Sequence, residues 1–234
     1  MRKMLVVMMA VVAVAFVGCT KEEKSGNNNA IDSITEQPTP EPNPQPTSVE
    51  WVDLGLPSGL LWATCNVGAN APEEYGDCFA WGETQTKSEY NWSTYAYGSA
   101  NNQLTKYCYN SEYGLDGFTD SLTILEPLDD AASVNWGNGA RIPTKEDWQE
   151  LINNTNAEWT TEKGVNGRRF TAPNGRSFFL PANGTAGTYW SASLDTYYPY
   201  RAWSFYFLSD RQLLIWDYMR SAGLPVRAVR AIQN

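Results

Sequence analysis

The sequence predicts an α+β domain with long loops and a β-rich C-terminal third. Three observations favour this class: a strongly patterned helix after Thr144, a loop-like segment at residues 71–120, and paired strand patterns from residue 168 onward. Residues 50–234 contain no second linker and no repeat of fixed period. A segment of this length suits one domain, which would bury about 70% of the surface of its unfolded chain.

Two strands are predicted to open the domain. Residues 51–66 have the pattern of a strand, a turn at Pro57-Ser58-Gly59 and a second strand that includes residues 60–63. The following segment, residues 71–120, is rich in Gly, Asn, Ser and Tyr and lacks sustained periodicity. We therefore expect long loops there, packed by their own aromatic side chains.

The clearest helix begins after Thr144 and ends at Asn154. Pro143 precedes it, and Thr144 can cap it together with Asp147 three residues later. One face of this helix is apolar and consists of Trp148, Leu151 and Ile152.

A shorter helix is predicted at residues 128–134. Glu126, Asp129 and Asp130 lie near its start, where the helix dipole favours acidic side chains, and we prefer this interpretation to a calcium site. A second acidic group is spread through loops and is interpreted as solvated charge rather than as a glycosidase pair. Its members are Asp53, Glu73, Glu74, Asp77 and Glu83.

The C-terminal third is predicted to consist of β-hairpins. Strands at 168–171 and 177–180 flank Pro173-Asn174-Gly175, which is a strong turn signal. Residues 164–167 are interpreted as a turn, and residues 189–193 as a further strand.

A second hairpin is predicted from strands at 202–208 and 212–216 around Ser209-Asp210-Arg211, and residues 226–232 are expected to close the sheet. Alternation along 202–208 places three aromatic side chains on one face, which we expect to face the core. They are Trp203, Phe205 and Phe207.

The N-terminal residues predict export and lipid anchoring. Arg2 and Lys3 precede a short apolar run at 4–17, and Gly18 stands before Cys19. This stretch resembles a bacterial lipobox, which implies a signal peptide at residues 1–18 and a lipidated Cys19 that ties the protein to a membrane. Residues 19–23 resemble the signal that sends lipoproteins of Bacteroidetes-type bacteria to the outer surface, so we expect an outer-membrane, surface-exposed protein.

Residues 19–49 are predicted to be a disordered tether between the lipid and the domain. The segment is polar, and proline occupies every second position from Pro38 to Pro46. This spacing favours extended polyproline II, with about 3.1 Å per residue, over helix or sheet.

Composition excludes several classes of function. The chain has no histidine, which removes Ser-His-Asp and Cys-His catalysis and His-ligated zinc or copper sites. A formal net charge of -9 argues against nucleic acid as a partner. We expect no cofactor and no catalytic residue. The 13 tyrosines and 10 tryptophans instead suit cores and recognition surfaces.

Three cysteines, Cys65, Cys78 and Cys108, remain beside Cys19. One disulfide among them and a set of small buried cysteines are both compatible with the sequence. The pairing therefore stays open at this point.

Motifs along the whole domain resemble the Fibrobacter succinogenes major paralogous domain of bacterial surface lipoproteins. The segments that carry the resemblance are Trp51-Val52-Asp53-Leu54-Gly55-Leu56-Pro57-Ser58-Gly59, Leu61-Trp62-Ala63, Tyr75-Gly76-Asp77, Ala80-Trp81-Gly82-Glu83-Thr84, Arg141-Ile142-Pro143-Thr144 with Trp148, Tyr189-Trp190-Ser191, Ala202-Trp203 and Val226-Arg227-Ala228-Val229-Arg230. The resemblance implies a C-type lectin-like fold of the formylglycine-generating-enzyme type.

The chain is also similar to the retroelement-diversified variable proteins, in which the segment before the last strand displays changeable side chains. Aromatic and arginine side chains at those positions suit a binding face, although several could simply fill the domain's own loops. The candidate ligand-binding residues are Tyr197, Tyr198, Tyr200, Arg201, Tyr206, Arg211, Trp216, Tyr218, Met219 and Arg220.

Three functions follow as hypotheses. The first is a non-catalytic cell-surface module that binds an extracellular protein or glycan through this C-terminal face, and the second is a structural or assembly component of the cell envelope. The third, a formylglycine-generating-type oxidase, would need a late pair of cysteines, but no cysteine follows Cys108. The sequence leaves the ligand, a calcium requirement and the oligomeric state open.

Overall fold

The computed structural model describes residues 49–210 and 213–232. The predicted signal peptide, Cys19 and nearly all of the predicted tether lie outside the described residues, as does Arg211. No helix among the described residues has the length and apolar character needed to cross a membrane.

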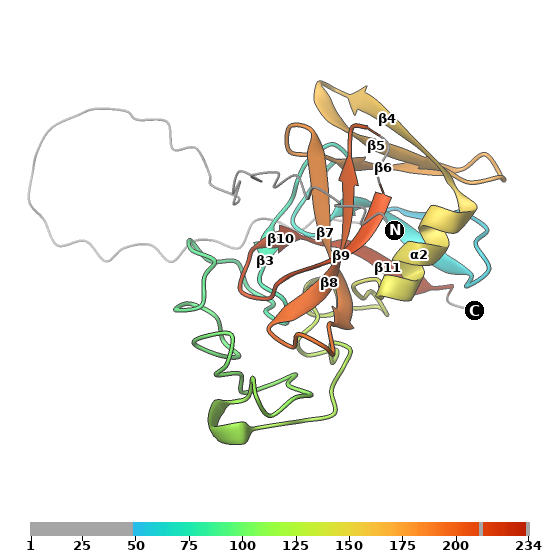
Figure 1. The fold of residues 1–234 in the computed structure, drawn as a ribbon. Coiled ribbons are helices and arrows are strands. Elements are labelled where there is room, and N and C mark those ends of the chain that lie inside the picture. Colours follow the sequence, from blue (N-terminus) through green and yellow to red (C-terminus); the bar gives the residue numbers. More distant parts are fainter. Residues whose placement is uncertain (1–48, 211–212, 233–234) are drawn as a thin grey trace, which may run out of the picture.

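The described residues form a mostly β structure with few helices (Figure 1), which confirms the coarse α+β, β-rich class. Strand β2 (Leu60–Asn66) lies between β1 (Trp51–Asp53) and β11 (Arg227–Ala231), and all three are antiparallel. The first and last described strands therefore meet on the same partner. A two-stranded sheet beside them pairs β3 (Cys78–Phe79) with β10 (Leu224–Pro225).

A second three-stranded sheet contains β4 (Asn156–Glu162), β5 (Val165–Thr171) and β6 (Ser177–Pro181) in that order. The predicted hairpin around Pro173-Asn174-Gly175 is confirmed by the β5–β6 register. The interpretation of residues 164–167 as a turn is wrong in part. The turn falls at Lys163 and Gly164, which both have positive φ, and Val165 already belongs to β5.

The third sheet carries the predicted binding segment. It contains β7 (Ala186–Leu194), β8 (Arg201–Leu208) and β9 (Leu213–Met219), with β8 in the middle. The predicted second hairpin is confirmed by the antiparallel β8–β9 register, which joins Phe205 to Ile215.

Two α-helices lie beside these sheets. Helix α2 (Lys145–Asn154) has the predicted capping box: the side chain of Thr144 accepts from the Asp147 amide, and the Asp147 side chain accepts from the Thr144 amide. Helix α1 (Ala131–Trp136) starts three residues later than predicted, because Asp130 caps it by accepting from the amides of Ala132 and Ser133.

The core cluster around α2 contains several aromatic rings in contact. Trp148 of α2 lies 4.9 Å from Trp62 of β2 and 4.7 Å from Phe205 of β8, measured between ring centroids. Burial of rings of this size is the main favourable term in folding. The cluster fixes β8 against α2 and β2, and thereby holds the sheet from which the candidate site extends.

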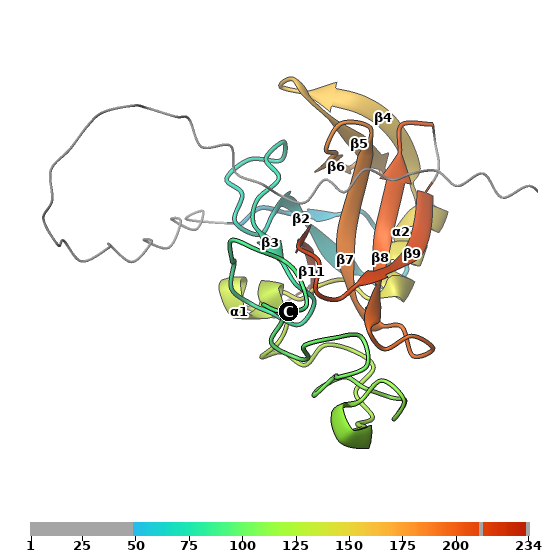
Figure 2. The same cartoon turned by 60° about the vertical axis from the view of Figure 1, so that its left-hand side comes forward.

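The segment between β3 and α1 is mainly loop, as predicted. It contains a short 3₁₀ turn, η1 (Leu115–Gly117), at its far end. In Figures 1 and 2 this green segment hangs below the sheets, while the β4–β6 sheet lies at the opposite end of the molecule.

Candidate functional site

The structure divides the predicted binding residues among three environments. Tyr197 and Tyr198 line a surface cavity, Tyr206 and Trp216 lie on the outer face of a sheet, and Arg220 lies in the interior.

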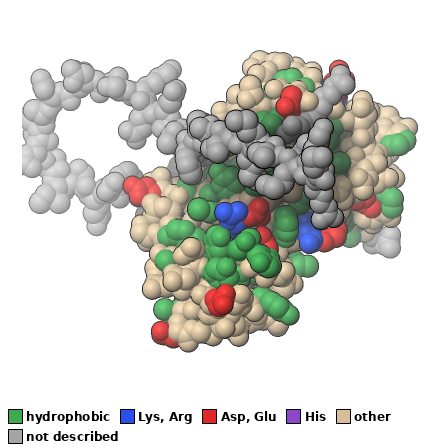
Figure 3. Space-filling view, viewed as in Figure 1, with side chains coloured by type: hydrophobic (Ala, Val, Ile, Leu, Met, Phe, Trp, Pro, Cys, Tyr) green, Lys and Arg blue, Asp and Glu red, His purple; other side chains and the backbone are tan. Residues whose placement is uncertain are grey.

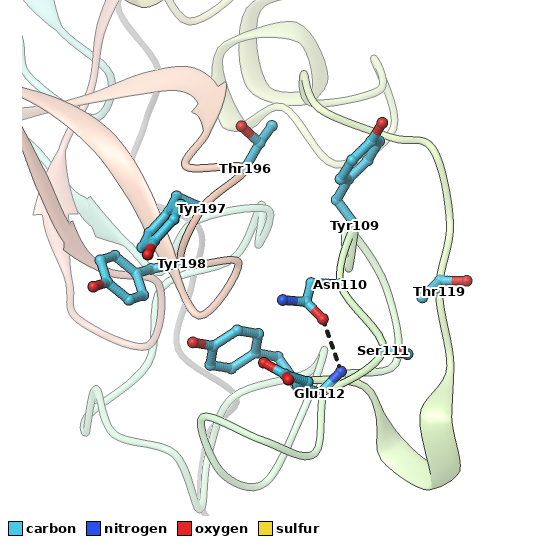
Figure 4. A pocket seen from close by; sticks show the side chains of 9 residues that line it. Tyr109, Asn110, Ser111, Glu112, Thr119, Thr196, Tyr197 and Tyr198 are labelled. Atoms are coloured by element: carbon cyan, nitrogen blue, oxygen red, sulfur yellow. Dashed lines mark hydrogen bonds between the residues drawn. The ribbon is translucent and has the colours of Figure 1, made fainter.

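The cavity has a volume of about 520 Å³ and separates two loops. Residues 109–113 and Thr119 form one wall, and residues 196–198, between β7 and β8, form the other (Figure 4). We call it the tyrosine pocket. Its lining residues are Tyr109, Asn110, Ser111, Glu112, Tyr113, Thr119, Thr196, Tyr197 and Tyr198.

Aromatic rings dominate this pocket. Tyr197 is 74% exposed and Tyr109 is 59% exposed, so both rings are accessible to a ligand. The rings of Tyr197 and Tyr198 meet edge to face at 4.6 Å, and Tyr200 continues the row, 5.7 Å from Tyr198 and 5.3 Å from Tyr113. Tyr200 thus joins the two walls. Rings that support one another in this way lose little freedom when a ligand binds.

Local hydrogen bonds hold each wall in place. Asp195 accepts from the amides of Tyr197 and Tyr198 at 2.9 and 3.2 Å, which shapes the loop between β7 and β8. In the other wall, the Asn110 side chain accepts from the Glu112 amide at 3.0 Å. Short polar side chains that bond backbone groups two or three residues away stabilise turns of this kind.

Arg220 is a correction to the predicted binding face. Its side chain has no exposed surface, and its guanidinium lies 5.0 Å from the ring of Trp81. It donates to the carbonyl of Pro199 at 2.9 Å, to that of Tyr107 at 3.0 Å and to that of Lys106 at 3.0 Å. Arg220 therefore joins the backbone segments next to the two walls of the tyrosine pocket, and it cannot contact a ligand on the surface.

Arg201 lies at the rim and is partly exposed. It forms an ion pair with Asp217, and its guanidinium lies 5.9 Å from the ring of Tyr198 and 5.4 Å from that of Tyr200. The ion pair raises the pKa of Arg201. Because Asp217 already neutralises it, Arg201 stiffens the tyrosine row more than it offers free positive charge.

A second surface lies on the outer face of the third sheet. Trp216 is 57% exposed, Leu214 is 38% exposed, and Tyr206 lies opposite Leu214 on β8. We call these three residues the sheet patch. Tyr218, on the same face, is half-buried against the core ring of Trp190 at 6.3 Å, so it partly fills the domain itself.

Alternation along β8 predicts the core only in part. Phe205 and Phe207 are fully buried, as expected, but Trp203 is half-exposed with Lys145 5.2 Å from its ring. Ser204, on the opposite face of the strand from these aromatic side chains, is fully buried and donates to the carbonyl of Trp216 at 2.7 Å. Burial along β8 therefore does not follow strict alternation.

The acidic cluster before α1 is structural. Asp130 caps the helix, and Asp129 accepts hydrogen bonds from Tyr97 at 2.6 Å, Tyr107 at 2.5 Å and Lys106 at 2.6 Å. Burial raises the pKa of Asp129, but these hydrogen bonds outweigh it and hold the pKa below its usual range. Within residues 49–210 and 213–232, no group of three or more Cys, Asp or Glu is placed to hold a metal ion.

Cys65 and Cys108 are buried free thiols, so they do not pair with each other. Burial raises the pKa of both. A raised pKa keeps the thiol protonated and unreactive near neutral pH.

The sequence interpretation missed one wall of the pocket. Tyr109, Glu112 and Tyr113 lie in the segment that was expected to pack its own aromatics, and no periodicity distinguishes an exposed ring from a buried one there.

In Figure 3, hydrophobic side chains gather in the middle of the described surface, among scattered acidic and basic side chains.

Comparison of the chain with protein-family models, with curated proteins and with solved structures found no match.

Proposed function

We propose that this protein is a non-catalytic binding module that a lipidated Cys19 displays on the outer membrane, and that it recognises an extracellular protein or glycan through the tyrosine pocket. The observation that carries the proposal is the set of four tyrosine rings that two loops, far apart in sequence, bring around one cavity. Tyrosine supplies large contact area and a polar hydroxyl with few rotamers to freeze, which is why it dominates recognition surfaces.

The rigidity of both walls supports this reading. Arg220 donates to carbonyls on both sides, and Asp195 fixes the loop of Tyr197 and Tyr198. A site held in its binding shape before the ligand arrives avoids the entropic cost of ordering loops. The C-type lectin-like fold that the motif resemblance implies, with recognition placed on loops, belongs to the same proposal.

An array of extracellular proteins and glycans, probed with the full mature chain, tests the proposal. The double variant Tyr197→Ala/Tyr198→Ala should lose binding while its circular dichroism stays unchanged, because both rings are exposed. Tyr206→Ala, which removes a tyrosine outside the pocket, is the matched control and should keep full binding. Equal binding by the double variant and the wild type would refute the role of the pocket.

Localisation needs a separate measurement. We expect wild-type protein on intact cells to be digested by added protease, and Cys19→Ser to leave the membrane fraction because it lacks the acceptor for the lipid. Retention of Cys19→Ser in washed membranes would contradict the predicted anchor.

The sheet patch supports a second candidate function, docking onto another envelope protein. Leu214 and Trp216 are exposed apolar side chains on β9, which pairs with β8 alone in its sheet. A stoichiometric partner that co-purifies with wild type but not with Trp216→Ala would favour this function, whereas co-purification with both would speak against it.

A further inference from the structure

The charged side chains that line the tyrosine pocket limit the class of ligand that it can bind. Glu112 is the only charged side chain among the nine that line the cavity, and no lysine or arginine is among them. The nearest arginine in the tyrosine row, Arg201, is already paired with Asp217. The residues that line the pocket therefore carry a net negative charge.

The aromatic rings also favour a cationic ligand. The face of a tyrosine ring carries partial negative charge and attracts cations within about 6 Å of its centroid. Four such rings surround this cavity, and Figure 4 shows the Glu112 carboxylate on the same wall as Tyr109 and Asn110.

The polar lining groups can accept hydrogen bonds. The lining residues include four tyrosines, Ser111, Thr119 and Thr196, whose hydroxyl oxygens can accept hydrogen bonds, together with the carboxylate-bearing Glu112. An ammonium group has three N–H donors and no acceptor, so it matches a lining of this kind. A carboxylate or phosphate ligand would face Glu112 with no basic lining residue to offset the repulsion.

From these observations we infer that the tyrosine pocket binds a lysine side chain presented by a protein partner. The inference rests on the proposed function and selects protein over glycan as its ligand. The ammonium group lies among the tyrosine rings and bonds Glu112, while the methylene stem packs on the ring faces. The formal charge of -9 on the whole chain draws a basic partner toward the site.

The test uses the full mature chain and the capped peptide Gly-Ser-Lys-Ser-Gly, titrated by NMR. A matched peptide carries Nε-acetyl-lysine, which keeps the stem but loses the charge. We expect the acetylated peptide to bind at least about tenfold more weakly, because it loses both the charge-assisted hydrogen bond and the cation–π contacts. Equal binding of the two peptides would overturn the inference.

Two charge variants separate the site from general electrostatics. Glu112→Gln should weaken binding of the lysine peptide by about tenfold. Glu158→Gln changes net charge by the same amount at an exposed residue of strand β4, at the opposite end of the molecule, and should leave binding unchanged. An equal loss in both variants would mean that net charge alone attracts the peptide, and would overturn the inference.

The outcomes also distinguish this inference from the function on which it rests. If an array ligand needs Tyr197 and Tyr198 but the lysine peptide neither binds nor competes, the lysine inference fails and the binding function stands. If Tyr197→Ala/Tyr198→Ala alters neither array binding nor peptide binding, the proposed function fails as well.

Discussion

Replacing Arg220 by methionine tests whether its buried hydrogen bonds hold the segments beside the tyrosine pocket in place. Methionine approximates the length of the side chain but removes donors to the Tyr95 hydroxyl and to three backbone carbonyls. Each buried acceptor left without a partner costs about 1–3 kcal/mol. Taking the lower end of that range for the four acceptors, we expect the free energy of unfolding to fall by about 4 kcal/mol.

For a domain of this size, 1 kcal/mol shifts the melting temperature by about 2–4 °C, so Arg220→Met should melt about 8–16 °C below wild type. Calorimetry and urea unfolding measure the change. Hydrogen exchange adds a local readout: amides of residues 106–113 and 197–200 should exchange faster than in wild type, because Arg220 no longer holds the two walls together.

The control for this substitution is Arg176→Met. The Arg176 side chain is 60% exposed, so its loss should change the free energy of unfolding by no more than about 0.5 kcal/mol. A loss below about 1 kcal/mol in Arg220→Met, or exchange that rises equally throughout the domain, would refute the proposed tie between the walls.

Three further predictions concern pH, thiols and the loop wall. Asp129→Asn should lower the free energy of unfolding at pH 7. Hydrogen bonding holds the pKa of Asp129 below its unfolded value, so the stabilisation that Asp129 provides is complete above the unfolded pKa and is lost as pH falls through the folded pKa. Urea unfolding from pH 7 to pH 3 should show the wild type and the variant converging, and a gap that stays constant would contradict the argument. Cys65 and Cys108 should resist iodoacetamide in the native protein and react after unfolding, because both thiols are buried with raised pKa. Peptide mass spectrometry maps the labelled positions, and rapid labelling of the native protein would show that the thiols are accessible. Gly114→Ala should displace the loop wall and weaken ligand binding, since its φ of −82° suits alanine but the added Cβ would lie 1.8 Å from the Phe118 carbonyl oxygen. Gly139→Ala adds a Cβ that meets nothing within 4 Å at a strained φ of +75°, so it should lower stability without weakening ligand binding.

Local patterns predicted most of the regular structure. The capping box of α2 depends on Thr144 and Asp147, which are three residues apart, and the β5–β6 hairpin depends on its Pro-Asn-Gly turn. Both devices act within a few residues, so a sequence window contains everything that determines them. Strand β4 was missed because its sequence, Asn156–Glu162, is polar and one of its faces is solvated.

The candidate site was predicted less completely. Tyr197, Tyr198 and Trp216 are exposed as expected, whereas Tyr218 is half-buried and Arg220 is fully buried. Residues 216–219 end strand β9 and Arg220 begins the turn that follows, so composition alone cannot separate a surface arginine from one that packs on Trp81. The opposite wall, with Tyr109 and Tyr113, has no periodic signal at all.

What the sequence determined by itself is therefore local: the caps and turns, the α+β class with a β-rich C-terminal third, the lack of histidine and the richness in tyrosine and tryptophan. Tertiary structure alone decided which rings surround a common cavity and which arginine became an internal tie. The physical reason is that exposure and pairing depend on neighbours brought from distant parts of the chain. The Arg220 side chain donates to the Pro199 carbonyl on one side and to the Tyr107 carbonyl on the other. The residues next to Arg220 in the sequence do not indicate that Tyr107 is its partner.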